Sequence, residues 1–410
     1  MPPPGIGTVA ASSLAALFGA VGGGIYYLRR RASRNWIDCG STGPRDLSAS
    51  SASGRGVIVV TGANAGLGYE AAREFARRNA TVVLACRDGA RAEEAADRIA
   101  RSIGIERGGR AADHPQSLAD PLLSARERLD CSLPPLDLAS LDSVERFVDG
   151  LEAKYAGTGV YALVCNAGVW VPMEDGRRTA DGYEVHFGVN HLGHLALAQA
   201  VADRIMAKQR GEGRVVWVSS GLAKSGRLDM EKLDFVYDGR TVGEQDEQSG
   251  PSVDACDNTG SGSSSSSSNN NKKKKGHASF APTGYCDSKL MNALANRHFA
   301  TRLGKTAPHV TSYACCPGFC RTSLGRNVQF PFYKKLLLGP LMLMIQRTSV
   351  QGAQNIIHVT LEDKDKLESG GMYRDGTIAK EETEYMDSLD RDLPQQLWDL
   401  SERLLTKRAK

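Results

Sequence analysis

Residues 57–68 read VIVVTGANAGLG, a run of β-branched residues that leads directly into a glycine-rich turn. Consecutive Val and Ile residues are typical of a strand that is buried on both faces of a parallel sheet. A helical pattern follows the turn and continues through Arg78. In such a unit, Gly62 and Gly66 allow a tight turn and the close approach of a pyrophosphate, and Gly68 lets the helix pack on the strand. The N–H groups of the helix N-terminus then face the phosphates, so the stretch predicts a dinucleotide-binding site.

Strands and helices continue to alternate after this unit. The pattern predicts strands at 81–86, 160–165, 214–219, 310–315 and near 371–373, with helices at 89–102, 140–155, about 181–208, 348–361 and near 394–407. It also predicts a helix that carries Tyr285 and Lys289 and ends at about Leu303. Such alternation implies a parallel sheet covered by helices on both faces. We therefore expect a doubly wound α/β (Rossmann) fold, with residues 56–407 forming a single NAD(P)-binding domain.

Three segments interrupt the alternation. Residues 103–135 are rich in Pro, Gly and charge, and we interpret them as a loop insertion with a short, weakly marked strand. Residues 236–280 contain runs of Ser, Asn and Lys without hydrophobic periodicity, which predicts a disordered surface insertion. Residues 328–347 are apolar and aromatic but contain two lysines and two prolines. We expect them to form a lid over an apolar site or a surface that contacts a bilayer.

The N-terminus predicts attachment to a membrane. Residues 2–28 carry no charge and are followed by Arg29, Arg30, Arg31 and Arg34. About 20 uncharged residues suffice for a helix to span a bilayer, and arginines directly after the segment place the rest of the chain in the cytosol. We expect residues 1–34 to be a membrane anchor. An organelle transit peptide is the alternative, because the first 37 residues lack acidic side chains. Residues 35–55 are Ser/Gly-rich and read as a linker.

Charge and cysteine content exclude other classes of protein. A net charge of +4 over 410 residues gives no reason to propose a nucleic acid partner. Nine cysteines without a C-x-x-C pair indicate free thiols in a reducing compartment. His191 and His194 have a spacing that could bind a metal, but no third ligand accompanies them, so we expect no metal site.

Tyr285 and Lys289 are the candidate acid–base pair. Four residues apart on a helix, they lie on the same face. A phenol has a pKa near 10, and an ammonium beside it favours the phenolate, so the pair could relay a proton at neutral pH. This spacing also arises by chance in many helices, so the assignment of the pair as catalytic depends on the other motifs in the sequence.

Arg87 bears on the choice of cofactor, because the end of the second strand lies beside the adenosine ribose in such a fold. An acidic side chain there repels a 2′-phosphate, whereas an arginine binds it. Asp88 follows at once, and a shift of one residue would place it at the ribose instead. We favour NADP(H) over NAD(H).

Five ordered motifs resemble those of the short-chain dehydrogenase/reductase superfamily, and the resemblance covers about residues 55–405. They are Thr61-Gly62-x3-Gly66-x-Gly68, Cys165-Asn166-Ala167-Gly168, Ser219-Ser220, Tyr285-x3-Lys289 and Pro317-Gly318. More narrowly, residues 85–88, 136–138, 179–184, 188–194 and 370–373, with the N-terminal segment, are similar to the retinol dehydrogenase group. Light-dependent protochlorophyllide reductases and the WW-domain oxidoreductase share several of these strings, but the first 50 residues contain no WW-like sequence.

The resemblance implies roles for the matching residues. Ser220, or alternatively Ser219, would hold the substrate oxygen, and Tyr285 would be the general acid or base. Lys289 would lower the phenol pKa and hold the nicotinamide ribose, and Asn190 would complete a proton path through a water molecule. The cofactor would contact Gly62, Asn64, Gly66, Leu67, Gly68, Arg87, Asp137, Leu138, Asn166, Ala167, Gly168, Tyr285, Lys289, Pro317 and Gly318.

We therefore predict an NADP-dependent enzyme that interconverts a lipophilic alcohol and its aldehyde or ketone. It would be anchored in the endoplasmic reticulum membrane and could form a homo-oligomer. One alternative is a carbon–carbon double-bond reductase of the protochlorophyllide reductase type. Another is a cofactor-binding scaffold without turnover.

Overall fold

The computed structural model describes residues 56–111, 121–172, 176–228, 230, 283–321, 324 and 346–407. The predicted anchor, the linker, the insertion at 236–280 and most of the apolar stretch at 328–347 lie outside these residues, so the interpretations made for them stay predictions. Among the described residues, no helix combines the length and apolar character needed to cross a bilayer.

The centre of the molecule is an eight-stranded sheet in the order β3-β2-β1-β4-β5-β6-β7-β8. All neighbouring strands are parallel except β8, which runs antiparallel to β7. This confirms the doubly wound fold. The strands are β1 (Val57–Thr61), β2 (Thr81–Ala85), β3 (Leu129–Asp130), β4 (Ala162–Cys165), β5 (Gly213–Val218), β6 (Val310–Cys315), β7 (Met372–Arg374) and β8 (Thr377–Ile378).

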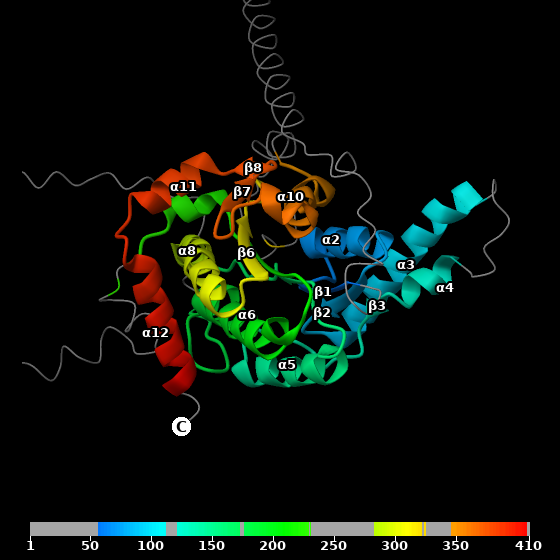
Figure 1. The fold of residues 1–410 in the computed structure, drawn as a ribbon, viewed down its shortest axis with the longest axis horizontal. Helices are drawn as coiled ribbons and strands as arrows, with labels where there is room; N and C mark the ends of the chain where they lie inside the picture. The colour runs from blue at the N-terminus through cyan, green and yellow to red at the C-terminus, as the bar shows by residue number, and fades with distance from the viewer. Residues whose placement is uncertain are drawn as a thin grey trace, which may run out of the picture.

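Helices cover both faces of the sheet (Figure 1). One face packs on α2 (Gly66–Arg77), α3 (Gly89–Ala111) and α10 (Ser349–Leu361), and the other on α5 (Leu141–Tyr155), α6 (Gly193–Arg204) and α8 (Thr283–Thr306). The strand β1 shows why: Val57 and Val59 belong to one apolar cluster, and Ile58 and Val60 belong to the other. Successive side chains of a strand point to opposite faces, so a fully apolar strand requires two cores.

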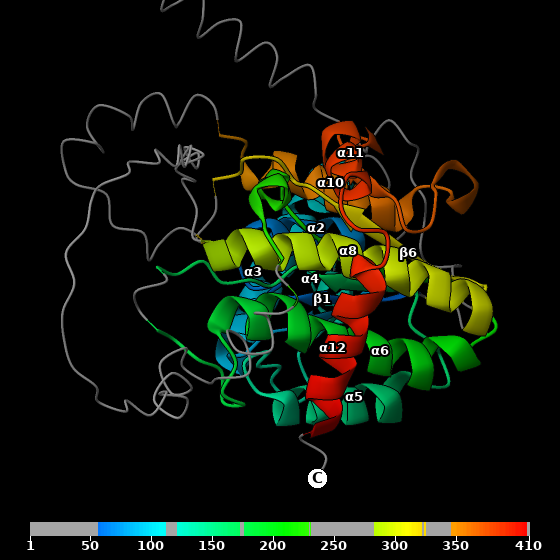
Figure 2. The same ribbon diagram turned by 90° about the vertical axis from the view of Figure 1, so that its left-hand side faces the viewer.

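The C-terminal helix α12 (Leu393–Lys407) crosses the outer side of α8, as Figure 2 shows. Phe299 of α8 stacks on Trp398 of α12 with ring centroids 5.5 Å apart, and it meets the edge of Trp217 of β5 at 6.1 Å. These contacts tie the end of the chain to the helix that carries Tyr285.

Several elements differ from the predicted pattern. The helix expected at 89–102 continues to Ala111, and α4 (Pro121–Arg126) lies where a loop was expected. Arg126 pairs with Glu93 and Asp97 of α3, which ties α4 to α3 in a way that helical periodicity alone does not reveal. The elements that the pattern missed include α11 (Lys380–Asp387), β8, and the short turns η4 (Met206–Lys208), η5 (Gly221–Ser225) and η7 (Lys364–Lys366).

The helix expected at 181–208 is also different. It begins as a π-helix, η3 (His186–Leu192), and becomes the α-helix α6 only from Gly193 to Arg204. All seven residues of η3 are buried. Single π-turns inside helices are frequent at functional sites, and this one contains Asn190.

Candidate active site

The turn after β1 is built for close approach of a ligand. Gly62 and Gly66 have φ angles of +66° and +60°, which side-chain-bearing residues rarely adopt. A Cβ on Gly68 would lie 2.5 Å from both the Gly62 carbonyl oxygen and the Asn166 Nδ2. The first helix can therefore meet the ends of β1 and β4 only if residue 68 is glycine.

The N-terminus of α2 has no side-chain cap, because its N-cap residue is Ala65. By contrast, Ser140 caps α5 and Thr348 caps α10 through side-chain hydrogen bonds. An uncapped helix start leaves backbone N–H groups and the positive end of the helix dipole for an anion. Gly66 and Leu67, the first two residues of α2, line a cleft. The residues present therefore fit a dinucleotide pyrophosphate.

The cleft runs along the carboxyl ends of the strands, at the point where the strand order reverses between β1 and β4. Open α/β sheets bind ligands at this position. The predicted cofactor residues that line it are Gly62, Asn64, Gly66, Leu67, Arg87, Asp137, Leu138, Asn166, Ala167 and Gly168. Gly68, Tyr285, Lys289, Pro317 and Gly318 do not line it, whereas Ala65, Arg91, Trp170 and Val189 line it without having been predicted.

Two arginines, Arg87 and Arg91, line the cleft after the end of β2. Asp88 accepts a hydrogen bond from the Arg91 backbone N–H at 3.2 Å and pairs with the Arg91 guanidinium at 3.3 Å. Its carboxylate is therefore engaged at the start of α3. Arg87 lines the same cleft, is exposed, and forms no ion pair with any other described residue. This part of the cleft carries more positive than negative charge.

Ser220 and Tyr285 come together as a pair. The Ser220 hydroxyl lies close enough to the Tyr285 phenol to lower the phenol pKa, although the residues lie 65 positions apart in the sequence. Ser220 is the N-cap of η5, and its Oγ also accepts from the Leu222 N–H at 3.2 Å. Ser219 is buried and donates its hydroxyl to the Lys289 carbonyl at 2.7 Å. Of the two serines, Ser220 is thus the one that can share a ligand oxygen with the phenol.

The pKa of the Tyr285 phenol is raised, not lowered as the sequence argument expects. Burial is the main cause, and the neighbouring Cys316 adds to it, while the hydrogen bond from Ser220 acts in the opposite direction. The Lys289 Nζ lies 5.6 Å from the centre of the phenol ring and donates to the Val218 carbonyl at 2.8 Å. Burial lowers the pKa of Lys289 to about 8. Tyr285 therefore keeps its proton at neutral pH and is ready to act as a proton donor.

Asn190 holds neighbouring segments together. Its side chain accepts from the Val169 N–H at 2.8 Å and donates to the Val169 carbonyl at 3.1 Å and to Ser288 Oγ at 3.0 Å. Its own carbonyl accepts from Asn292 Nδ2 at 2.9 Å and lies 3.1 Å from His194 Nδ1. Both acceptor positions of that carbonyl are used by protein groups. Asn190 thus positions the segments around it, and its expected part in a relay through water stays a prediction.

Apolar side chains surround the phenol. Trp170 stacks on Tyr285 with ring centroids 5.2 Å apart and an interplanar angle of 20°. Leu222 and Leu324 pack against the same small cluster. Trp170 also lines the cleft, so it joins the dinucleotide site to the Ser220–Tyr285 pair. The only sequence signal that Trp170 belongs to the site was its position two residues after Gly168.

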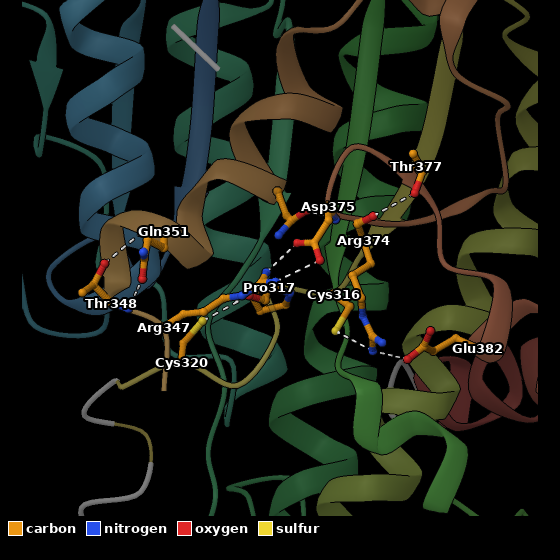
Figure 3. A network of polar contacts seen from close by, with 11 residues as sticks. Cys316, Pro317, Cys320, Arg347, Thr348, Gln351, Arg374, Asp375, Thr377 and Glu382 are labelled. Carbon is orange, nitrogen blue, oxygen red and sulfur yellow. Dashed lines mark hydrogen bonds and ion pairs between the residues drawn. The ribbon is translucent and has the colours of Figure 1, made fainter. Parts of the chain in front are cut away.

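The loop that contains Pro317 and Gly318 is fixed by two arginines, which Figure 3 shows. Arg347 pairs with Asp375 through bonds of 2.6 and 2.9 Å, and it lies 3.4 Å from the Pro317 carbonyl. Arg374 donates to Cys316 Sγ at 3.4 Å and pairs with the buried Glu382. The hairpin of β7 and β8 therefore braces this loop from behind, an arrangement that the sequence analysis did not anticipate.

In the described part of the chain, no three His, Cys, Asp or Glu side chains are grouped so that they could hold a metal ion. The His191 Nε2 lies 3.1 Å from Ser401 Oγ, and both ring nitrogens of His194 lie beside protein oxygens. The seven cysteines in these ranges are free thiols.

Comparison with known proteins agrees with this geometry. The family model described as short chain dehydrogenase matches residues 56–113 and 109–231. Retinol dehydrogenase 14 of Mus musculus is 32% identical over 395 residues, which cover 96% of this chain and 97% of that protein. The chain belongs to the short-chain dehydrogenase/reductase family. Within this family it is retinol dehydrogenase-like, and the match confirms that it is an oxidoreductase of a family that binds nicotinamide cofactors.

One further sequence match and one structural match extend the comparison. Protochlorophyllide reductase A, chloroplastic, of Oryza sativa subsp. japonica is 28% identical over 358 residues, covering 86% of this chain and 81% of that protein. A crystal structure of an uncharacterised protein from Mycobacterium paratuberculosis superposes with a TM-score of 0.52 at 25% identity, covering 88% of this chain and 96% of the other.

The close approach at Gly68 gives a direct prediction. Gly68→Ala should weaken binding of a nicotinamide dinucleotide at least about tenfold, because the added methyl group would displace Gly62 or Asn166 and such overpacking costs about 1–3 kcal/mol. Gly304→Ala in α8 is the matched control, since a Cβ there meets no atom within 4 Å. Titration of both variants by intrinsic fluorescence measures the effect. Equal affinity in the two variants would show that the approach is not needed.

The buried Lys289 predicts a pH dependence of stability. Its folded pKa of about 8 lies below the ordinary value of 10.5. Between these two values the unfolded chain binds the extra proton, so stability rises with pH. Relative to Lys289→Met, the wild-type free energy of unfolding should increase by about 2 kcal/mol between pH 7 and pH 10. Urea denaturation at several pH values tests this, and parallel profiles for the two proteins would contradict it.

Proposed function

We propose that this chain is an NADP(H)-dependent oxidoreductase that interconverts a lipophilic alcohol and its aldehyde or ketone. The proximity of the Ser220 hydroxyl to the Tyr285 phenol, beside the dinucleotide cleft, carries the proposal. Two hydroxyl groups that converge on one point can hold a single substrate oxygen. Trp170 lines the cleft and stacks on Tyr285, which supports a substrate site next to the bound cofactor.

The residues of the site divide the chemistry as follows. The bound cofactor would supply or accept a hydride at the substrate carbon. During reduction, Ser220 and Tyr285 donate hydrogen bonds to the carbonyl oxygen and stabilise the negative charge that develops there. Tyr285 then transfers its proton to that oxygen. Lys289, with its ammonium beside the phenol ring, stabilises the phenolate that remains.

The preference for NADP(H) rests on Arg87 and Arg91. Both line the cleft at the end of β2, and the one carboxylate between them, Asp88, is already paired with Arg91. A guanidinium binds a phosphate through paired, charge-assisted hydrogen bonds. The 2′-phosphate of NADP(H) would meet these groups, whereas NAD(H) offers them no charge.

The lipophilic character of the substrate rests on the surroundings of Tyr285, where Trp170, Leu222 and Leu324 form an apolar wall. The retinol dehydrogenase relatives agree with a substrate of this kind. The proposal retains a membrane anchor at residues 1–34, a location at the endoplasmic reticulum with the domain in the cytosol, and a homo-oligomeric state. These three points rest on the sequence alone.

A second candidate function is reduction of a carbon–carbon double bond, because the similarity extends to a protochlorophyllide reductase. Such a reaction would not need two hydroxyl groups on one oxygen, so the Ser220–Tyr285 pair favours carbonyl chemistry. A scaffold without turnover would need neither group.

Activity should depend on the Tyr285 hydroxyl. NADPH oxidation by the purified full-length protein, measured with a panel of lipophilic aldehydes and ketones, should fall about 10²–10⁴-fold in Tyr285→Phe, because the proton donor is lost. The affinity for NADPH should change little. Tyr155→Phe is the matched control, since this phenol at the end of α5 donates to Asp130 of β3 and lies outside the cleft. Equal activity in wild type and Tyr285→Phe would refute the proposed mechanism.

Cofactor choice should depend on Arg87. Arg87→Ser should raise the KM for NADPH about 10–100-fold and leave the KM for NADH nearly unchanged, since hydrogen bonds to charged groups contribute about 1.5–3 kcal/mol. Arg101→Ser is the control, because Arg101 is exposed on α3 and does not line the cleft. If Arg87→Ser raises the KM for NADPH and for NADH equally, the arginine does not bind the 2′-phosphate.

A further inference from the structure

His194 is a buried side chain whose ring joins the cofactor turn to the catalytic helices. It is fully buried in the first turn of α6. Its Nε2 lies 3.0 Å from the hydroxyl of Thr61, at the end of β1. Its Nδ1 lies 3.1 Å from the carbonyl oxygen of Asn190, in the π-turn η3. A histidine with both nitrogens bonded across two elements fixes their separation.

The direction of these bonds follows from their partners. The Asn190 carbonyl can only accept, so Nδ1 carries the ring hydrogen. Burial lowers the pKa of His194 to about 3, and the ring is therefore neutral at working pH with an unprotonated Nε2. The Thr61 hydroxyl must then donate to Nε2. That choice leaves the Thr61 oxygen free to accept from the backbone N–H groups of Asn166 and Ala167, at 2.8 and 2.9 Å.

The two ends of this chain of bonds lie at different parts of the site. At one end, Thr61 sets the positions of Asn166 and Ala167, which line the cofactor cleft. At the other end, the Asn190 carbonyl also accepts from Asn292 of α8, the helix that carries Tyr285 and Lys289. The side chain of Asn190 reaches the same helix through Ser288.

We propose that His194 is a positioning residue that sets the distance between the dinucleotide turn and the Tyr285–Lys289 helix. The proposal rests on the proposed function, because it assumes that hydride transfer occurs between these two parts. Loss of the Nε2 acceptor would free the Thr61 hydroxyl to turn to the Val164 carbonyl, which lies 3.3 Å away. Loss of the Nδ1 donor would release the π-turn instead.

Two substitutions separate the two bonds. The amide of asparagine occupies the place of Nδ1, so His194→Asn keeps a donor for Asn190 and removes the acceptor for Thr61. The longer glutamine reaches the place of Nε2, so His194→Gln keeps an acceptor for Thr61 and removes the donor for Asn190. Thr61→Val removes the hydroxyl with little change in shape.

The experiment uses the full-length protein, with NADPH and NADH as probes of binding and aldehyde reduction as the probe of turnover. His194→Asn and Thr61→Val should each raise the dissociation constant for NADPH about tenfold, and the double variant should be no worse than Thr61→Val alone, because both remove one shared interaction. His194→Gln should bind NADPH within about threefold of wild type but show a kcat about tenfold lower, since a lost buried hydrogen bond displaces the helix.

His191→Asn is the matched control. His191 is equally buried in η3, where its Nε2 lies 3.1 Å from Ser401 Oγ of α12 and its Nδ1 lies 3.4 Å from Asn292 Oδ1. Asparagine keeps an amide donor for Asn292 at the place of Nδ1, so this variant loses only the bond to Ser401. The His191→Asn variant should lose thermal stability, while its affinity for NADPH and its kcat stay within about twofold of wild type. If the His194 variants lose only thermal stability, or if the double-variant effects multiply, the inference is wrong. Should one histidine variant fail to fold, the other still gives the split between affinity and kcat.

The two proposals fail in different ways. A wild-type protein that binds neither NADPH nor NADH overturns the proposed function. A wild-type protein that binds and turns over, with His194 variants that do the same, overturns only the role of His194.

Discussion

The hydroxyl of Thr61 determines how the site is built. It accepts hydrogen bonds from two consecutive backbone N–H groups at the end of β4, and the Asn166 side chain returns a bond of 2.8 Å to the Thr61 carbonyl. These bonds hold the ends of β1 and β4 together where the strand order reverses. The helices that follow the two strands must then diverge to opposite faces of the sheet, and the cleft lies between them. A buried hydroxyl with all its bonds satisfied keeps this geometry fixed.

The packing also buries the two groups that we propose to be catalytic. Tyr285 and Lys289 are nearly inaccessible to water, so each is shifted toward its neutral form. A neutral phenol beside Ser220 is suited to give a proton to a carbonyl oxygen. The C-terminal hairpin supports this centre from outside, since Asp375 and Glu382 hold the arginines that contact the loop after β6. The Thr61 contact between β1 and β4, the proton of Tyr285 and the Arg347–Asp375 ion pair therefore all depend on the packing of the same elements.

The sequence predicts those features that depend on neighbouring residues. The strand at 310–315, the glycine turn and the pairing of Tyr285 with Lys289 follow from local periodicity and spacing. The features it missed depend on partners distant in the chain. The π-turn forms around Asn190, whose partners lie near residues 169 and 288. The helix α4 pairs with α3 through Arg126 and Asp97, which lie 29 positions apart. The raised pKa of Tyr285 was missed for the same reason, because burial is set by the whole fold and not by the residue four positions away.

Transfer of deuterium tests the central claim most directly. The wild-type protein would be incubated with NADPH that carries deuterium at C4 and with a lipophilic α,β-unsaturated aldehyde, and the product examined by mass spectrometry and NMR. The account predicts one deuterium on the carbinol carbon of an alcohol whose double bond is intact, with the hydroxyl proton exchangeable with water. Deuterium on the former alkene carbon, or no transfer to any member of a panel of carbonyl compounds, would contradict it.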